Sequence, residues 1–245
     1  MLLSHPLRLP LHDEVHQRPG LAVPTPARLS TVTVTDTDAA SHRLHLNKLL
    51  AHWQKPLIGN DVVHADIEFD GTILRWSLHN EFARFTLMQT EPEAADFEKT
   101  ALQSLPRAWC EAMPGKIIFA MHALVLPEEH MQESLAESAR VWFEGRPLVG
   151  SRIAHEQAIA ISDFFRHPDS MVEHGAARLV IFNFAAGKRL IGRMLQDFFE
   201  METYRMMALL SFPLAKKLLP VVTELEDTLQ SITNAIAGGE DPELT

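Results

Sequence analysis

Several features are scarce or missing in this chain. Its single cysteine, Cys110, cannot form an internal disulfide, which fits a reducing compartment. There is no run of about 18 apolar residues and no apolar segment of signal-peptide type near the start, so the segment itself is not predicted to contact a membrane. Lys and Arg number 22 against 32 Asp and Glu, a formal net charge of −10. This deficit of positive charge argues against a nucleic-acid-binding protein.

The common catalytic motifs are absent too. We find no P-loop, no G-x-G-x-x-G, no G-x-S-x-G, no H-E-x-x-H and no paired C-x-x-C. No cofactor is evident, although the acidic composition would allow a divalent metal. The 245 residues, 46% of them hydrophobic, form an ordinary globular mixture. A chain of this size buries about 70–75% of the surface that it exposes when unfolded, so its stability does not require a disulfide or a metal.

The order of elements predicts an α+β fold, with a mixed, largely antiparallel sheet followed by two C-terminal helices. Residues 27–35 are rich in β-branched side chains, which predicts a strand, and Asp70-Gly71 predicts a tight hairpin turn. The predicted strands are 27–35, 61–69, 72–79, 83–89, 116–126, 147–154, 158–164 and 177–184. The predicted helices follow a cap at Asp36 or Thr37 to about 54, and then span 128–143, about 187–211 and 213–237.

The same order, strand, helix and three strands, occurs at 27–89 and again at 116–184. It suggests an internal duplication of a β-α-β-β-β unit. We therefore expect an α+β domain over 1–184 and a helical pair over 187–237 that packs on it or extends from it. Residues 238–245 are expected to be a frayed tail, since Gly238-Gly239 ends the last helix.

The segment 11–19 concentrates groups that donate, accept and titrate. On an extended backbone His12, Glu14, His16 and Arg18 point the same way, and Asp13 points the other. Two histidines and a carboxylate could bind a metal, and the same face with Arg18 could bind an anion. The alternative is a structural latch held by salt bridges, which we favour because the spacing matches no defined motif.

A second polar set lies in the strand and turn over 75–82. Alternation puts Arg75, Ser77, His79 and Glu81 on one face and Trp76, Leu78 and Phe82 on the other. With His16, the pair His79 and Glu81 could ligate a cation, or Glu81 could orient His79 as a general base. The competing interpretation is an exposed sheet face with cross-strand ion pairs.

The penultimate helix carries a third set. Glu202 and Arg205 are three residues apart and can pair, while Glu202 or Tyr204 pointing inward would need a buried partner. By contrast His122, inside an apolar strand, is predicted to be a satisfied core histidine.

Four separated segments resemble the DUF3422 family of bacterial proteins. Residues 11–19 resemble its L-N-D-E-V-H-A-R-P opening and 74–82 its L-R-W-E-R-H-T-E-F. Residues 149–151 match its V-G-S, and 201–215 are close to I-E-T-Y-R-M-M-A-L-L followed by P-L-A. Departures fall at positions 12, 77, 78 and 80. The matched polar set, a candidate site expected to converge in space, is Asp13, Glu14, His16, Arg18, Arg75, His79, Glu81, Glu202, Tyr204 and Arg205.

The resemblance implies an uncharacterised, membrane-anchored protein whose members continue into a helical coiled region and transmembrane helices. Either an anchor is expected beyond residue 245 or this protein lacks one. We expect a cytoplasmic domain, membrane-associated in the full-length protein, with an assembly, sensing or ion-linked role. The alternative is a hydrolase or phosphoryl-handling enzyme that uses a His/Glu/Arg cluster. The apolar faces of the last two helices permit a homo-oligomer.

Overall fold

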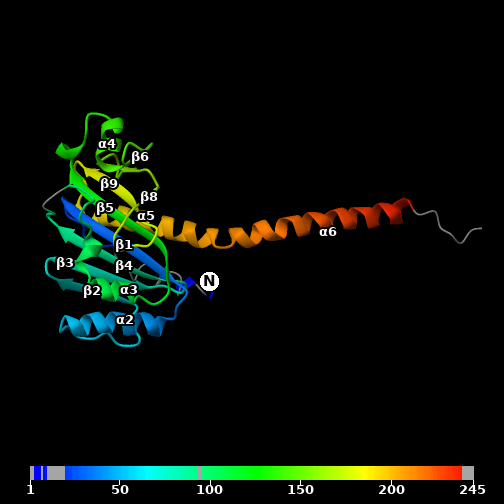
Figure 1. The fold of residues 1–245 in the computed structure, drawn as a ribbon, viewed down its shortest axis with the longest axis horizontal. Coiled ribbons are helices and arrows are strands. Elements are labelled where there is room, and N and C mark those ends of the chain that lie inside the picture. The colour runs from blue at the N-terminus through cyan, green and yellow to red at the C-terminus, as the bar shows by residue number, and fades with distance from the viewer. Residues whose placement is uncertain (1–2, 7, 10–19, 93–94, 239–245) are drawn as a thin grey trace, which may run out of the picture. The chain divides into compact units, whose positions relative to one another are not determined.

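The computed structural model describes residues 3–6, 8–9, 20–92 and 95–238. The chain divides into two compact units, Met1–Thr203 and Tyr204–Thr245. The first unit is built on a single mixed sheet (Figure 1). This confirms the predicted α+β class.

Within the described residues the sheet has nine strands, which pair in the order β2-β3-β4-β1-β5-β9-β7-β6, with the short β8 beside β9. All described pairings are antiparallel except that of β5 with β9. The strands are β1 (Ala27–Thr35), β2 (His64–Phe69), β3 (Thr72–Leu78), β4 (Ala83–Thr90), β5 (Lys116–Pro127), β6 (Val149–Ile153), β7 (Ala158–Ser162), β8 (Arg166–His167) and β9 (Ala176–Asn183).

Strand β1 lies in the middle of the strand order and is covered on both faces. Every residue of Ala27–Thr35 is buried, and its β-branched side chains suit a pleated, packed surface. At the edge, β2 and β3 are joined by the expected turn, in which Asp70 and Gly71 have φ of 42° and 73°. Glycine tolerates this left-handed conformation without steric cost, so the turn fixes the hairpin register.

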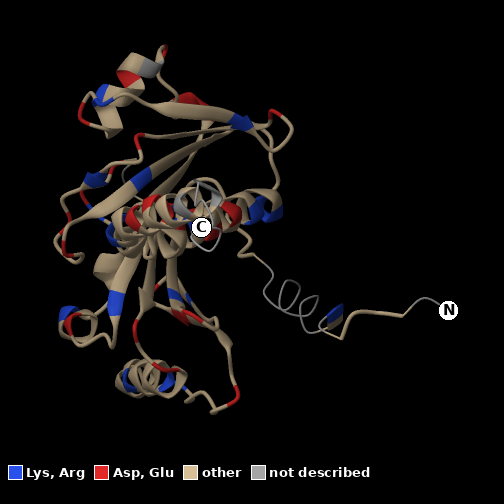
Figure 2. Ribbon diagram, turned by 90° about the vertical axis from the view of Figure 1, so that its right-hand side faces the viewer, with Lys and Arg blue, Asp and Glu red and all other residues tan. Residues whose placement is uncertain are grey.

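Helices cover the two faces of the sheet separately. One face packs against α2 (Ala39–His52), η1 (Ala101–Ser104) and α3 (Arg107–Glu111), and the other packs against α5 (Lys188–Leu209) through Ile191, Leu195 and Phe199. A third apolar cluster lies around Trp142 in α4 (Leu135–Trp142), which follows η2 (Glu128–His130). In the first unit Lys and Arg are interspersed with Asp and Glu along the loops and helices (Figure 2).

One helix prediction was wrong in detail. The continuous helix expected over 128–143 is two short pieces, η2 and α4, because Met131 and Ser134 have extended backbone and Ser134 caps α4 by accepting from the N–H of Glu137. Sequence reasoning also missed the two-residue β8. Without β8, the two halves of the sheet have matching strand orders, β2-β3-β4-β1 and β6-β7-β9-β5. They differ in direction, because β4 pairs with β1 antiparallel whereas β9 pairs with β5 in parallel. The duplication therefore stays a prediction.

The second unit contains the end of α5 and the helix α6 (Phe212–Gly238), with Pro220 inside it. One helical stretch, Lys188–Asn234, is long and apolar enough to cross a membrane by length and composition alone. Its most apolar window has a mean hydropathy of 1.4, and none of that window is buried. Such a helix is compatible with membrane association, and equally with a helix covered by protein.

Candidate functional site

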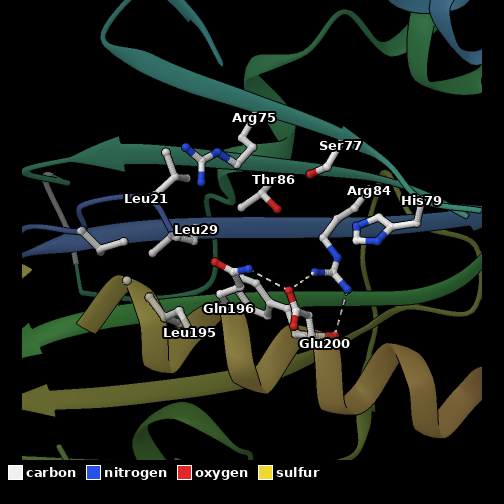
Figure 3. A pocket seen from close by; sticks show the side chains of 13 residues that line it. Leu21, Leu29, Arg75, Ser77, His79, Arg84, Thr86, Leu195, Gln196 and Glu200 are labelled. Atoms are coloured by element: carbon white, nitrogen blue, oxygen red, sulfur yellow. Dashed lines mark hydrogen bonds and ion pairs between the residues drawn. The ribbon is translucent and has the colours of Figure 1, made fainter. Parts of the chain in front are cut away.

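A pocket lies between the β3–β4 face of the sheet and α5 (Figure 3). About 480 Å³ of space, part of it open to solvent, is not filled by atoms. Its described lining divides into a polar and an apolar part. The lining residues are Leu21, Val23, Leu29, Arg75, Ser77, His79, Arg84, Thr86, Gly192, Leu195, Gln196, Phe199 and Glu200.

Strand register explains why the polar side chains meet. Arg75 of β3 lies directly opposite Thr86 of β4, and Ser77 lies opposite Arg84. Because cross-strand partners project from the same face, all four side chains point toward α5. The alternate residues of β3, such as Trp76, point into the core on the α2 side. The predicted division of this strand into a polar and an apolar face is therefore confirmed for its regular part.

Arg84 joins the sheet to α5. Its side chain is 6% exposed, and Nη2 donates to Thr203 Oγ1 at 3.0 Å and to the Phe199 carbonyl at 3.4 Å. Nη1 lies 3.9 Å from Glu200 Oε1, which also accepts from Gln196 Nε2 at 2.8 Å. A buried guanidinium needs such partners, because an uncompensated charge is costly in the interior. This network fixes the helix over the pocket.

Arg75 is held by the edge strand β2. Its Nε and Nη2 donate to the two carboxylate oxygens of Asp66 at 2.7 and 2.6 Å, a bidentate pair across β2 and β3. His79 stacks on Phe82, with ring centroids 4.2 Å apart and planes at 24°. The arginine and the imidazole therefore have defined orientations at the pocket wall.

A glycine of α5 lets the segment around Leu21 approach the helix closely and close the apolar side of the pocket. An added Cβ at Gly192 of α5 would lie 1.6 Å from the Leu21 carbonyl oxygen, so only glycine permits this approach. The N–H of Val23 donates to the Lys188 carbonyl at 2.9 Å, which ties the same segment to the start of α5. Leu21 and Val23 thereby join Leu29 in the pocket wall.

A buried Ser–His–Asp relay lies on the opposite face of the sheet. Leu102 N–H donates to Ser30 Oγ at 3.1 Å, Ser30 Oγ lies 2.8 Å from His122 Nδ1, and His122 Nε2 lies 3.1 Å from Asp169 Oδ2. Burial alone would raise the pKa of Asp169, but the hydrogen bonds from His122 and from the N–H groups of Met171 and Val172 hold it below its ordinary value.

This relay resembles a catalytic triad only in composition. Ser30 is fully buried and His122 is 4% exposed, so a substrate has no access to the hydroxyl. Every member has its partners. His122 is thus the satisfied core histidine that the sequence predicted.

A second closed cluster surrounds His167. Its Nε2 lies 2.8 Å from Asp163 Oδ2 and its Nδ1 lies 3.2 Å from Glu144 Oε1. Arg178 Nη1 is 3.6 Å from Glu144, and Arg146 stacks over the Phe165 ring at 3.7 Å. The hydrogen bond from His167 lowers the pKa of Glu144. The cluster shares no residue with the pocket and ties β8 to the loop after α4.

A family comparison matches nearly the whole chain. The model described as "Protein of unknown function (DUF3422)" matches residues 3–244. The chain belongs to the DUF3422 family. No curated protein and no solved structure matches it. The resemblance seen in the four sequence segments is therefore confirmed, and the family supplies no activity.

In this DUF3422 chain the pocket includes two members of the matched polar set, Arg75 and His79. Glu81 lies past the end of β3 and is exposed, so it does not share the strand face as expected. Glu202 is 5% exposed in the first unit. Tyr204 and Arg205 belong to the second unit. Asp13, Glu14, His16 and Arg18 lie outside the described residues.

The metal set His16, His79 and Glu81 stays a prediction, since His16 is outside the described residues. Among the residues that the structure describes, no group of three or more His, Cys, Asp or Glu side chains is placed to hold a metal ion.

Sequence reasoning missed Arg84, Gln196 and Glu200. Arg84 alternates with the apolar Phe85 and Ala83, which is the signal that would have placed it on the face of Ser77. Gln196 and Glu200 are four residues apart on one helix and so share a face. Which face of α5 meets the sheet depends on tertiary packing, and the sequence alone does not give it.

Proposed function

We propose that this DUF3422 chain is a non-catalytic sensing domain whose pocket holds a small organic anion with an aliphatic part. The observation that carries the proposal is the division of the pocket lining. Two arginines, Arg75 and Arg84, line one side and Leu21, Val23, Leu29 and Leu195 the other. Small-molecule sites are characteristically apolar cavities with a few placed polar groups.

Electrostatics support an anion. Arg75 and Arg84 are both in the lining, but of their carboxylate partners only Glu200 is, because Asp66 pairs with Arg75 from outside the lining. With both carboxylates counted the cluster is formally neutral, so the support for an anion is the presence of two charged hydrogen-bond donors in a partly enclosed space, where low-dielectric walls strengthen a charge-assisted hydrogen bond. A carboxylate at the arginines would leave its alkyl chain against the aliphatic wall.

The polar groups of the pocket are held in fixed positions, and this favours sensing over catalysis. Arg84 is locked to α5 by Thr203 and Phe199, and Arg75 is locked to Asp66. These contacts orient binding groups and transmit occupancy to the helix. The proposed setting is the cytoplasmic side of a membrane-associated bacterial protein. The single cysteine fits a reducing compartment, and the resemblance of the four sequence segments implies the membrane association.

The test is calorimetric titration of the whole chain with butanoate, hexanoate and octanoate. Each methylene that reaches the aliphatic wall should tighten binding about 4-fold, from roughly 0.8 kcal/mol per buried CH₂. The corresponding alcohols should bind more weakly, since they lack the charge. Equal affinity for all three acids, or for acids and alcohols, would contradict the proposal.

Two variants make the test specific. Arg75→Gln should weaken octanoate binding, whereas Arg107→Gln, which breaks an exposed pair with Glu111, should not. The enzyme alternative has its own readout, because Ser77 and His79 line the same pocket. Turnover of hexanoyl esters or phosphomonoesters that is lost in His79→Gln would replace sensing by hydrolysis.

A further inference from the structure

The helix α6 presents an apolar surface to solvent along its whole described length. Its described side chains, from Phe212 to Asn234 and Ile236, are all exposed, and the large apolar ones are 47–76% exposed. A helix gains most of its stability from burying an apolar face, so a 27-residue helix of this composition requires a covering partner.

The apolar residues follow a seven-residue repeat. Spacings of three and four alternate over three heptads, and we call these positions the α6 seam: Ala215, Leu218, Val222, Leu225, Leu229, Ile232 and Ile236. The charged residues of α6 all lie off the seam. Lys216, Lys217, Glu224 and Asp227 are on the opposite side, and Glu226 flanks it.

The repeat indicates what covers the seam. A strict 3.5-residue period is the property of helices that supercoil around one another, whereas a globular surface or a lipid surface does not select it. The five charges within Lys216–Asp227 also oppose burial in a bilayer, where each costs about 2.5–3.5 kcal/mol. A second α6 has the same repeat and therefore fits.

We propose that α6 forms a parallel, in-register two-stranded coiled coil with a second copy of this chain. Val222 at an a position with Leu225 at a d position favours two strands, whereas the next pair, Leu229 at a with Ile232 at d, favours more, so a wild-type tetramer would also overturn the two-stranded assignment. In this arrangement Val221 of one copy faces Glu226 of the other, and Thr228 faces Thr233. No like charges meet across the seam. The inference concerns a different unit from the pocket and does not depend on the sensing proposal.

The first test is the mass of the full chain in solution by light scattering and sedimentation equilibrium. Wild type should be a dimer. The seam variant Leu225→Glu, Leu229→Glu should self-associate on the order of 100-fold more weakly, because it buries carboxylates in the interface. The matched control Thr223→Glu, Gln230→Glu adds the same charge on the solvent side and should remain a dimer. A monomeric wild type, or a dimeric seam variant, would overturn the proposal.

Cysteine crosslinking tests the orientation without disrupting the fold. Leu225→Cys should form a disulfide-linked dimer rapidly, since equivalent d positions face each other only in a parallel pair. Thr223→Cys should not. The native Cys110 gives little background, because burial raises its pKa to about 11. Failure of Leu225→Cys to crosslink, or binding of monomeric wild type to phosphatidylcholine vesicles through α6, would contradict the assignment.

Discussion

Replacing Asp169 by asparagine probes the buried relay most sharply. A carboxylate can only accept, so in the native protein His122 Nε2 carries a proton toward Asp169 and Nδ1 accepts from Ser30. In Asp169→Asn the amide oxygen can still accept from the N–H groups of Met171 and Val172. Its NH₂ group then faces His122 Nε2. The histidine must change tautomer, and Ser30 loses its acceptor.

The magnitude follows from the lost contact. A hydrogen bond to a charged group contributes about 1.5–3 kcal/mol, and the backbone contacts of residue 169 are kept. Unfolding a domain of this size shifts by about 2–4 °C per kcal/mol, so we expect Tm to fall by roughly 3–12 °C. Glu111→Gln, which breaks an exposed ion pair, should change the free energy of unfolding by less than about 0.5 kcal/mol.

Two assays decide the question. Calorimetric unfolding gives Tm, and long-range ¹H–¹⁵N correlation gives the His122 tautomer. Wild type should show the proton on Nε2, and Asp169→Asn should show it on Nδ1. An unchanged tautomer, or a variant as stable as Glu111→Gln, would show that the Asp169 carboxylate does not fix the histidine.

Three further predictions concern other buried groups. Burial, together with the nearby charge of Lys48, lowers the pKa of His45 to about 4 from its ordinary 6.5. Between these two pH values the unfolded chain binds a proton that the folded chain does not, so stability should fall as the pH drops from about 6.5 toward 4. His45→Phe, which retains stacking on Trp109, should flatten that pH dependence of Tm. Cys110, with its pKa raised to about 11, should react with iodoacetamide at pH 8 about 100-fold more slowly in the folded than in the unfolded chain, and comparable rates would contradict its burial. Gly192→Ala should lower the free energy of unfolding by roughly 1–3 kcal/mol because its Cβ would meet Leu21, whereas Gly187→Ala, with open space around it, should be neutral in urea titration.

Local patterns predicted much of the fold. The β-branched side chains of Ala27–Thr35 and the Asp70-Gly71 turn predicted the central strand and the edge hairpin, because strand propensity and positive φ are local requirements. The parallel pairing of β5 with β9 was beyond local reasoning. It depends on how the chain crosses over between strands far apart in sequence.

The candidate site was only partly predictable for the same reason. Alternation placed Arg75, Ser77 and His79 on one face, yet Gln196 and Glu200 of α5, which line the same pocket, are more than 100 residues away in the sequence. The relay of Ser30, His122 and Asp169 likewise joins residues 92 and 47 positions apart. Such meetings are set by tertiary packing, so single residues of this kind look like ordinary core or turn positions in the sequence.

The sensing proposal requires an organic anion in the pocket under α5. The most direct measurement is an NMR titration of the whole chain with [1-¹³C]octanoate, read by intermolecular NOEs. We expect saturable binding, with alkyl protons close to the methyl groups of Leu29 and Leu195 and a carboxylate resonance that shifts in wild type but not in Arg75→Gln. Octanoate that gives no NOE to these methyl groups, or that shifts identically in the variant, would contradict the account.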